Sequence, residues 1–314
     1  MNGDGGCNIA IHKQKIVTKN KFFEIKISND EEQWNVYAPS SIEKPADHSV
    51  MFISGRFMKN WKQLLKVRYC VVFWPKEYPV FTELNRRHLI LPCDNPRLEY
   101  ARFFQAHHIK NLPVHEPANN LSESCISEKA CLGKHITVMP GAYIGPEVLI
   151  GDNVYIGHGV CLLGKVTVGN HVVIRENSVI GADGLSMERE ADGRMISIPQ
   201  FGGVCIQDEV QIGANVTVAR GSIDDTLIGK GTIIDNHCFI SHNVKIGENV
   251  AIVGESILFG SSEVGNNSFI SGNVAVRDGK KIGKNTLIGM GSVVVKDVSD
   301  DSIMKGNPAV CIKK

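Results

Sequence analysis

A six-residue repeat of apolar residues constrains the fold of this chain more than any other feature. From residue 126 onward nearly every sixth position is aliphatic, and this ladder runs through Ile126, Leu132, Val138, Ile144, Ile150, Ile156, Leu162, Val168, Ile174 and Ile180. The ladder returns at Ile206, Ile212 and Val218, and it then continues from Ile228 to Val294. Such hexapeptide self-similarity is typical of a parallel β-helix, in which each hexad forms one short strand and one turn.

The same repeat predicts how the β-helix buries its core. Three hexads close one triangular coil, so every ladder residue points inward and successive coils bury a continuous aliphatic column. Glycine and asparagine lie between many of the strands, and both accept the positive φ angles of tight corners. The chain has 31 glycines and only 7% aromatic residues, which suits short strands joined by tight turns. We therefore expect a mostly β fold, with a parallel β-helix over residues 126–298.

Two interruptions break the repeat. The first, GLSMEREADGRMISIPQFGG at residues 184–203, is long, polar and rich in glycine, and the second is the short stretch GSIDDT at residues 221–226. A solenoid accommodates insertions as loops on one face, which is often the binding face. Residues 184–203 are therefore expected to project outward, either as a tolerated surface excursion or as part of a binding site.

The N-terminal part of the chain lacks the six-residue repeat and predicts a small α/β domain. Residues 48–54 and 68–75 are apolar enough for buried strands, and residues 56–67 and 95–109 have helical spacing. In the second helix the expected inner face is formed by Leu98, Ala101 and Phe104. Asn95 and Pro96 are a favourable start for that helix, because asparagine caps the first turn and proline is accepted there.

These patterns divide the chain into parts with expected boundaries. Residues 1–114 form the small α/β domain, a candidate for nucleotide (uridine) binding, and residues 115–125 form the linker. The β-helix follows over residues 126–298, and residues 299–314 form a C-terminal tail.

Composition and charge narrow the function classes. The net charge of +1 and the pI near 7.6 argue against broad nucleic-acid binding. The N-terminus lacks the apolar core of a signal peptide, and no apolar run approaches the ~20 residues that a membrane-spanning helix needs. The nine cysteines are odd in number and form no C-x-x-C pair, which indicates reduced thiols rather than disulfides or a zinc site. We expect a cytoplasmic protein without a metal ion.

Four stretches of the sequence together carry a resemblance to a known family. They are NPRLEYARFFQ (95–105), VIGADGLSMEREADGRMISIPQFGGVCI (179–206), EVQIGANVTVARGSIDDTLIG (209–229) and IIDNHCFISHNVKIGEN (233–249). They resemble the UDP-3-O-acylglucosamine N-acyltransferases, which acylate a sugar amine in lipid A synthesis. Hexapeptide repeats of this kind also resemble the left-handed β-helix acyltransferases in general. The resemblance implies a left-handed β-helix and a homotrimer with active sites between its subunits.

The resemblance assigns catalytic roles to three residues. His242 matches the general base of the family, Asp235 the carboxylate paired with it, and Gly260 the residue whose backbone N–H serves the oxyanion. Acyl transfer to nitrogen suits these groups, because a histidine can take the proton of the amine near pH 7 and a carboxylate can orient its ring. Asp235 and His242 are seven residues apart, so they could meet at one corner of a coil or across the trimer interface. No metal is required.

The resemblance also suggests residues that contact the substrate. Phe52 matches an aromatic residue that stacks on the uracil ring, and Phe57 is the candidate for a second ring. Asn236, His237 and Asn243 flank the catalytic candidates and are expected to bind substrate. The alternatives are a solvated corner residue for His237 and core positions for the two phenylalanines.

Three departures from the family pattern leave the substrate open. The second active-site histidine of the family falls at about Gly279, and its uracil-contacting asparagine falls near Gly55. The sequence ends in KGNPAVCIKK, which lacks the C-terminal helices of the family and resembles the ending of the sugar and serine acetyltransferases. Both the acyl donor and the acceptor therefore remain to be identified.

The sequence favours an enzyme over other classes of protein. The leading hypothesis is an N-acyltransferase that moves an acyl group from a CoA or acyl carrier protein thioester to a nucleotide-linked amino sugar, in bacterial surface-polysaccharide synthesis. The alternative is the UDP-3-O-(3-hydroxyacyl)glucosamine N-acyltransferase of lipid A synthesis, which uses acyl carrier protein. A non-catalytic trimeric scaffold is a further hypothesis. A zinc-dependent lyase is disfavoured, because it needs three histidines and no third one at matching spacing is evident beside His237 and His242. No permanently bound cofactor is expected.

Overall fold

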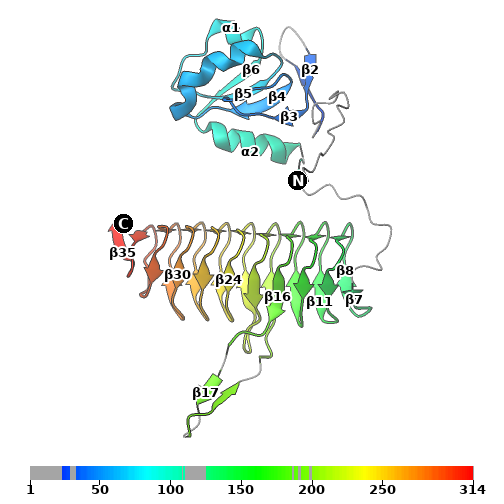
Figure 1. Ribbon diagram of the computed structural model, residues 1–314, viewed down its shortest axis with the longest axis vertical. Coiled ribbons are helices and arrows are strands. Elements are labelled where there is room, and N and C mark those ends of the chain that lie inside the picture. The colour runs from blue at the N-terminus through cyan, green and yellow to red at the C-terminus, as the bar shows by residue number, and fades with distance from the viewer. Residues whose placement is uncertain are drawn as a thin grey trace, which may run out of the picture. The chain divides into compact units, whose positions relative to one another are not determined.

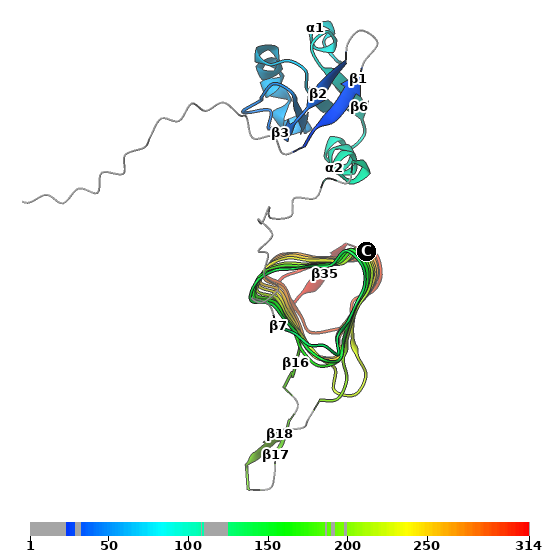
Figure 2. The same ribbon diagram turned by 90° about the vertical axis from the view of Figure 1, so that its right-hand side faces the viewer.

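The chain divides into two compact units. The computed structural model describes residues 23–28, 33–107, 109, 125–185, 187–189, 192–197 and 200–313. The first unit is Met1–Val114 and the second is His115–Lys314 (Figures 1 and 2). The expected linker lies outside the described residues except for Cys125, which begins the first strand of the second unit.

The first unit is built on a four-stranded parallel sheet. Its strands are β3 (Ala38–Pro39), β4 (Ser49–Phe52), β5 (Val71–Pro75) and β6 (Leu89–Cys93), paired in that order. The other elements are an antiparallel pair, β1 (Ile25–Ser28) and β2 (Gln33–Val36), the 3₁₀-helix η1 (Gly55–Lys66), and the helices α1 (Thr82–Asn85) and α2 (Pro96–Ala106). Strands β4 and β5 fall within the segments that the sequence predicted as buried strands.

Helix α2 packs on the sheet through aromatic residues. The predicted inner face is wrong at Leu98, which is 42% exposed, and at Ala101, which is also exposed. The rings of Tyr100 and Phe103 lie instead against Phe73 of β5, with ring centroids 6.4 and 6.0 Å away. Large aromatic rings bury more apolar area than leucine or alanine, so they determine which side of the helix faces the sheet.

The second unit is a left-handed parallel β-helix with three flat faces, as the sequence predicted (Figures 1 and 2). The first face contains β7 (Cys125–Ile126), β10 (Tyr143–Ile144), β13 (Cys161–Leu162), β16 (Val179–Ala182), β21 (Thr217–Ala219), β24 (Phe239–Ile240), β27 (Ile257–Leu258), β30 (Ala275–Val276) and β33 (Val293–Val294). The second contains β8 (Cys131–Leu132), β11 (Val148–Ile150), β14 (Val166–Val168), β19 (Val204–Ile206), β22 (Thr226–Ile228), β25 (Lys245–Ile246), β28 (Glu263–Val264) and β31 (Lys281–Ile282).

The third face closes each coil and reaches the end of the chain. It contains β9 (Thr137–Val138), β12 (Tyr155–Ile156), β15 (Val173–Ile174), β20 (Gln211–Ile212), β23 (Ile233–Ile234), β26 (Ala251–Ile252), β29 (Phe269–Ile270), β32 (Leu287–Ile288), β34 (Ile303–Lys305) and β35 (Val310–Lys313). β34 pairs in parallel with β32, and β35 returns antiparallel to β34. The segment expected as a tail therefore contributes the last strands of this face.

The predicted ladder forms the core. Every ladder residue from Ile144 to Val294 is at most 5% exposed. The expectation of an inward, buried residue is wrong at Leu132, which is 42% exposed because its strand, β8, lies at the open end of its sheet. A second buried row, two positions before the ladder, consists of small residues such as Val148 and Ser178, and the hydroxyl of Ser178 donates to the Gly213 carbonyl at 2.7 Å.

The corners between faces confirm the expected positive φ angles. His237, Asn243 and Asn249 lie at three successive corners of one coil, with φ of 59°, 60° and 54°. Glycines directly after ladder residues have another role: a Cβ on Gly229 would lie 2.4 Å from the backbone of Gly247 in the next coil. These glycines permit close stacking of coils rather than an unusual backbone angle.

The first interruption projects from the β-helix, as predicted (Figure 2). It carries an antiparallel hairpin of β17 (Met187–Arg189) and β18 (Met195–Ser197). In the described part of the chain no helix is both long and apolar enough to span a membrane.

Candidate functional site

The two interruptions of the repeat meet at one corner of the β-helix. The end of the projecting loop, at Phe201 and Gly202, donates backbone hydrogen bonds to the carbonyls of Ser222 and Gly221, at 2.8 and 3.0 Å. Gly221 donates in return to Gly203 at 3.1 Å. The segment 220–225, here called the bulge, therefore holds the base of the loop although the two are inserted into different coils.

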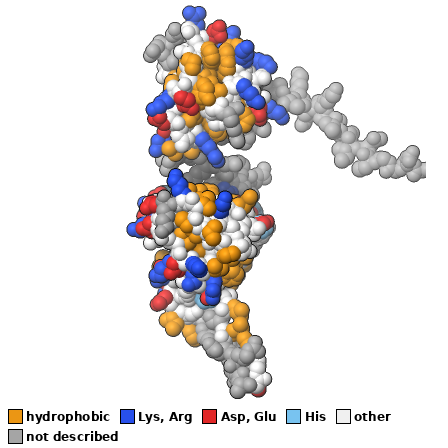
Figure 3. All heavy atoms as spheres, turned by 90° about the vertical axis from the view of Figure 1, so that its left-hand side faces the viewer, with side chains coloured by type: hydrophobic (Ala, Val, Ile, Leu, Met, Phe, Trp, Pro, Cys, Tyr) orange, Lys and Arg blue, Asp and Glu red, His pale blue; other side chains and the backbone are white. Residues whose placement is uncertain are grey.

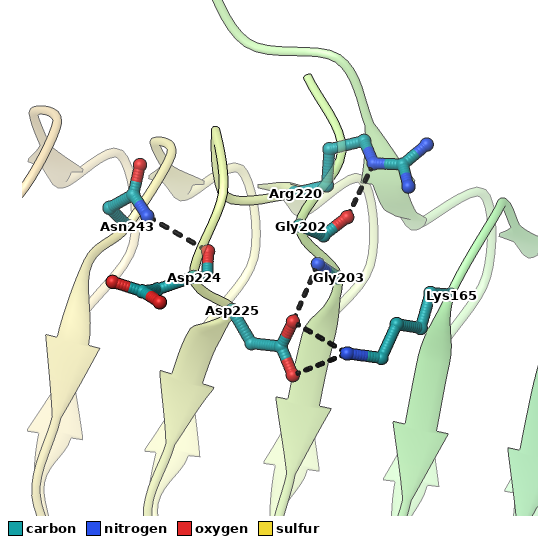
Figure 4. Close-up of polar contacts among 7 residues, drawn as sticks. All are labelled: Lys165, Gly202, Gly203, Arg220, Asp224, Asp225 and Asn243. Atoms are coloured by element: carbon teal, nitrogen blue, oxygen red, sulfur yellow. Dashed lines mark hydrogen bonds and ion pairs between the residues drawn. The ribbon is translucent and has the colours of Figure 1, made fainter.

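Charged side chains fasten this junction further (Figure 4). One carboxylate oxygen of Asp225 accepts the N–H of Gly203 at 2.7 Å and lies 3.2 Å from the Lys165 ammonium. The Arg220 guanidinium donates through Nε to the Gly202 carbonyl at 2.7 Å. The base of the loop is thus held by side chains from both ends of the bulge.

His242 lies beside this junction and is half-buried. It follows β24, on the corner formed by residues 241–244, here called the His242 corner. A Cβ on Gly184 of the loop would lie 3.2 Å from His242 Cβ and Cδ2, and a Cβ on Gly260 would lie 2.6 Å from Cε1 and Nε2. The imidazole therefore occupies the space that two glycines leave open. Gly184 is itself held by its N–H, which donates to Oε1 of the buried Gln200 at 2.8 Å.

The neighbouring Asn243 connects His242 to the bulge. Its Oδ1 accepts the Ser222 N–H at 3.0 Å and lies 3.2 Å from His242 Nδ1. Its Nδ2 donates to the Asp224 carbonyl at 2.9 Å (Figure 4). Asn243 was expected to contact substrate, and in this structure its amide oxygen and one amide N–H are bonded within the chain.

Gly260 presents an unbonded backbone donor next to the imidazole. It is buried, its carbonyl accepts the Gly279 N–H at 2.9 Å, and its own N–H has no acceptor within the described ranges. A fixed N–H of this kind can stabilise negative charge on a reacting carbonyl oxygen.

Asp235 lies on a different corner from His242. It follows β23, on the corner formed by residues 235–238, here called the Asn236 corner. Its carboxylate accepts the N–H of Asn236 at 2.8 Å and that of Gly254 at 3.2 Å. Within one chain the two catalytic candidates are therefore separated by the first face.

Asn236 and His237 share the corner of Asp235 and are exposed. The Asn236 side chain caps the preceding coil by accepting the Ala214 N–H at 2.7 Å. His237 donates its backbone N–H to the Ala214 carbonyl at 3.0 Å. Its side chain is placed for contact with solvent or with another molecule, but not with His242 of the same chain.

The two aromatic candidates of the first unit line one pocket. This pocket of about 470 Å³ contains Phe52, Phe57 and seven further residues, namely Pro39, Ser40, Ser41, Ile42, Glu43, Ser54 and Tyr100. The rings of Phe52 and Tyr100 lie 5.1 Å apart, and burial raises the pKa of the Tyr100 hydroxyl. Aromatic walls with hydroxyl and carboxylate groups between them suit a flat, polar ring such as a nucleobase.

A larger hollow lies elsewhere, on the second face. Its volume is about 600 Å³, and Lys245, Glu263 and Lys281 alternate along it. None of the predicted site residues lines this hollow, and its alternating charges favour no single class of ligand. We therefore place the candidate site at the His242 corner, where the unbonded donor and the half-buried imidazole lie together.

Sequence reasoning missed several residues that build the site. Gly184 and Gln200 position the loop against His242, and Lys165 pairs with Asp225. The signal that could have found them is the pair of interruptions, because inserted segments in nearby coils must lie side by side. In the described ranges, no three histidine, cysteine or acidic side chains are grouped to hold a metal ion.

Comparison with known proteins agrees with the motifs. The family described as "Bacterial transferase hexapeptide (six repeats)" matches residues 147–182. A UDP-3-O-acylglucosamine N-acyltransferase from Coxiella burnetii (strain RSA 493 / Nine Mile phase I) is 36% identical over 187 residues, 55% of each chain. One from Methylorubrum populi is 42% identical over 142 residues, which cover 45% of this chain and 40% of the relative.

Solved structures share the fold. A UDP-N-acetylglucosamine acyltransferase from Campylobacter jejuni superposes with a TM-score of 0.55 at 24% identity, over 60% of this chain and 72% of that one. The enzyme from Bacteroides fragilis 9343 gives the same TM-score and identity, over 63% and 73%. The chain spans about half the length of the curated relatives it matches. The resemblance to UDP-3-O-acylglucosamine N-acyltransferases is confirmed by these matches, and the relatives named here are acyltransferases.

Proposed function

We propose that this relative of the UDP-3-O-acylglucosamine N-acyltransferases transfers an acyl group from a thioester to the amine of a UDP-linked amino sugar. The observation that carries the proposal is the half-buried imidazole of His242 beside Gly260, whose N–H has no acceptor among the residues that the structure describes. The leading hypothesis from sequence was an amino sugar of surface-polysaccharide synthesis. The curated matches favour the alternative, a 3-O-acylated glucosamine of lipid A synthesis, and we adopt it.

The proposed chemistry uses the groups of the His242 corner. The neutral amine attacks the thioester carbonyl, and His242 Nε2 takes the proton that the nitrogen loses. The carbonyl oxygen gains negative charge in the tetrahedral intermediate and is stabilised by the Gly260 N–H. The carbon–sulfur bond then breaks, and the imidazolium returns the proton to the leaving thiolate. The net products are an amide and a free thiol, with no other reactant.

We infer that the working enzyme is a homotrimer, because one chain keeps Asp235 away from His242. The third face exposes an apolar column formed by Ile233, Phe269 and Leu287, whose strands lie in register along the β-helix. Large exposed apolar areas are typical of surfaces that a partner covers. A second copy seated on this face would exclude it from water, and the proposal requires that copy to bring its His242 corner to the Asn236 corner beside this face.

The projecting loop and bulge support transfer of an apolar group. Apolar side chains are exposed on them, namely Leu185, Met187, Met195, Phe201 and Ile223 (Figure 3). Apolar side chains close to His242, the proposed general base, suit an acyl chain better than they suit a polar donor arm. We propose acyl carrier protein as the donor that presents this chain, with acyl-CoA as the alternative.

The pocket between Phe52 and Phe57 is the proposed site of the uracil ring. Stacking between aromatic rings adds about 0.5–1.5 kcal/mol beyond the area it buries, which is enough to orient a base. Titration calorimetry with UDP tests this assignment. Phe52→Leu should weaken UDP binding several-fold, and unchanged affinity would remove Phe52 from the site.

Thiol release is the decisive test of the activity. Purified protein is mixed with 3-hydroxyacyl thioesters of acyl carrier protein or CoA and with UDP-3-O-acylglucosamine, or with UDP- and dTDP-amino sugars that lack the 3-O-acyl group. His242→Ala should lower turnover by about 100-fold or more. Glu248→Ala is the matched control, because Glu248 is the equivalent residue of the next corner and is exposed.

Three results would overturn the proposal in different ways. If His242→Ala kept wild-type turnover, His242 would not be the general base. Release only with amino sugars that lack the 3-O-acyl group would restore the surface-polysaccharide hypothesis. If the protein neither released thiol nor bound a nucleotide, it would be a scaffold protein.

A further inference from the structure

We propose that Asn243 is a positioning residue that holds the proton of neutral His242 on Nδ1 and so keeps Nε2 free to act as a base. The inference deepens the proposed function, because its catalytic consequence requires His242 to be the base. The tautomer itself can be measured without any turnover.

Two backbone groups fix the orientation of the Asn243 amide. A backbone N–H can only donate and a carbonyl can only accept, so the Ser222 N–H must face Oδ1 and the Asp224 carbonyl must face Nδ2. The two contacts, at 3.0 and 2.9 Å, come from opposite ends of the amide and agree on one orientation. The amide of Asn243 is therefore oriented by backbone groups, which resolves the usual ambiguity between oxygen and nitrogen.

The oriented amide determines which nitrogen of the imidazole carries the hydrogen. Oδ1 of Asn243 lies 3.2 Å from His242 Nδ1, and an amide oxygen can only accept. Nδ1 must then carry the hydrogen of the neutral ring, and Nε2 must carry the lone pair. Nε2 is also the ring nitrogen nearer to Gly260, since a Cβ there would lie 2.6 Å from Nε2 and 3.2 Å from Nδ1, and the Gly260 N–H is the proposed oxyanion donor. The selected tautomer thus points the basic nitrogen toward the position of the reacting groups.

The acceptor is also held rigidly. The side chain of Asn243 is bonded to the bulge, and its backbone N–H donates at 2.9 Å to Oγ1 of Thr226, the first residue of β22 directly after the bulge. The bulge is clamped in turn by Asp225 and Arg220. These bonds distinguish Asn243 from Asn249, which has a similar φ but lies on a corner without an inserted segment.

The experiment compares variants by nitrogen NMR. Protein labelled with ¹⁵N-histidine is examined at a pH where His242 is neutral, and its signals are assigned by their loss in His242→Ala. Asn243→Gly removes the acceptor while tolerating the positive φ. Asn243→Asp keeps an acceptor oxygen, and Asn249→Gly is the matched control one hexad away.

The expected results distinguish positioning from a general structural role. Wild type, Asn243→Asp and Asn249→Gly should show the proton on Nδ1, whereas Asn243→Gly should show exchange between both tautomers. In the thiol-release assay, Asn243→Gly should lower kcat by about 10- to 100-fold with little change in KM, because the loss affects the base and not binding. Asn243→Asp should recover part of that loss.

Two outcomes separate this inference from the proposed function. An unchanged tautomer in Asn243→Gly, in a protein whose activity still depends on His242, would overturn the role of Asn243 alone. The expected tautomers in a protein that releases no thiol from any donor would leave the orientation in place and overturn the proposed function together with its catalytic consequence.

Discussion

Two corners of the same coil have nearly the same backbone and differ in almost everything else. The His242 corner and the Glu248 corner (residues 247–250) each place a residue with positive φ third, Asn243 at 60° and Asn249 at 54°. On the Glu248 corner, Glu248 and Asn249 are exposed and the Asn249 N–H pairs with the preceding coil. On the His242 corner the second residue is half-buried, and its neighbour Asn243 is bonded to Ser222, Asp224 and Thr226.

The difference comes from what was inserted next to each corner. The Glu248 corner stacks on regular coils, whereas the His242 corner stacks on the bulge and faces the projecting loop. A solenoid supplies many equivalent corners, and each repeat contacts only its neighbours. A site with a buried, oriented side chain therefore requires a local departure from the repeat.

The largest expected effect comes from filling the space that Gly260 leaves for the imidazole. In Gly260→Ala the new methyl group would stand 2.6 Å from Cε1 and Nε2, so the ring must move away from its position. We expect turnover to fall about 100-fold while the fold is retained, because the end of a side chain moves rather than the backbone. Thiol release and circular dichroism measure the two effects.

Gly272→Ala is the matched control for this substitution. Gly272 is also the second residue of a corner, and a Cβ there meets its nearest neighbours at 3.4 and 3.6 Å, which is ordinary contact. Activity close to wild type is expected. Equal losses of turnover in both variants would show that neither corner tolerates an added methyl group, and would contradict a special role of Gly260 beside the imidazole.

A smaller effect is expected from loosening the clamp on the bulge. Asp225→Ala leaves the Gly203 N–H without its acceptor and should cost about 1–3 kcal/mol of stability. Lys165→Met keeps that hydrogen bond and loses only a partly exposed ion pair, which should cost at most about 1 kcal/mol. Urea unfolding followed by circular dichroism gives both values.

Lys230→Met serves as the reference for the clamp. Lys230 pairs with Glu209 at 3.1 Å, and both side chains are more than half exposed. Its loss should be smaller than that of Asp225→Ala. If all three variants unfolded at the same urea concentration, the contacts of Asp225 would stabilise the protein no more than an ordinary surface ion pair does.

The smallest effect concerns the sealed inner side of the Asn236 corner. Cys238 follows the exposed His237, yet it is buried, and burial raises the pKa of its thiol to about 11. We expect iodoacetamide at pH 8 to modify the exposed Cys131 and Cys311 and to leave Cys238 unmodified in the folded protein, as mass spectrometry would show. Early modification of Cys238 would contradict a closed coil.

The raised pKa also predicts a weak dependence of stability on pH. The folded state holds the Cys238 proton more tightly than the unfolded state, whose pKa stays near the ordinary 9.0. The contribution of the neutral thiol is therefore complete below about pH 9 and is lost as the pH rises through about 11. Cys238→Ala should remove this part of the alkaline destabilisation.

Much of the fold could be predicted from the sequence, because the burial of each ladder residue depends only on the neighbouring coils. A ladder residue such as Ile240 is buried by the coils directly above and below it, so its position in the hexad is sufficient to predict its burial. The same reasoning failed at Leu132, whose strand β8 is the end strand of its sheet in the described residues, and on α2, where Tyr100 and Phe103 rather than Leu98 pack on the sheet. Local patterns describe contacts between neighbours and fail at boundaries.

The sequence by itself determined the β-helix, the buried ladder and the identity of His242 and Gly260 as candidates, since these depend on period and motif. Only the tertiary structure decided that Asp235 lies on another corner, and that Gly184 and Ser222 lie against the residues of the His242 corner. The physical reason is that each coil returns the chain to the same face after eighteen residues or more. Contacts between coils depend on where the inserted segments lie. The two residues of such a contact are too far apart in the sequence to appear in one short window.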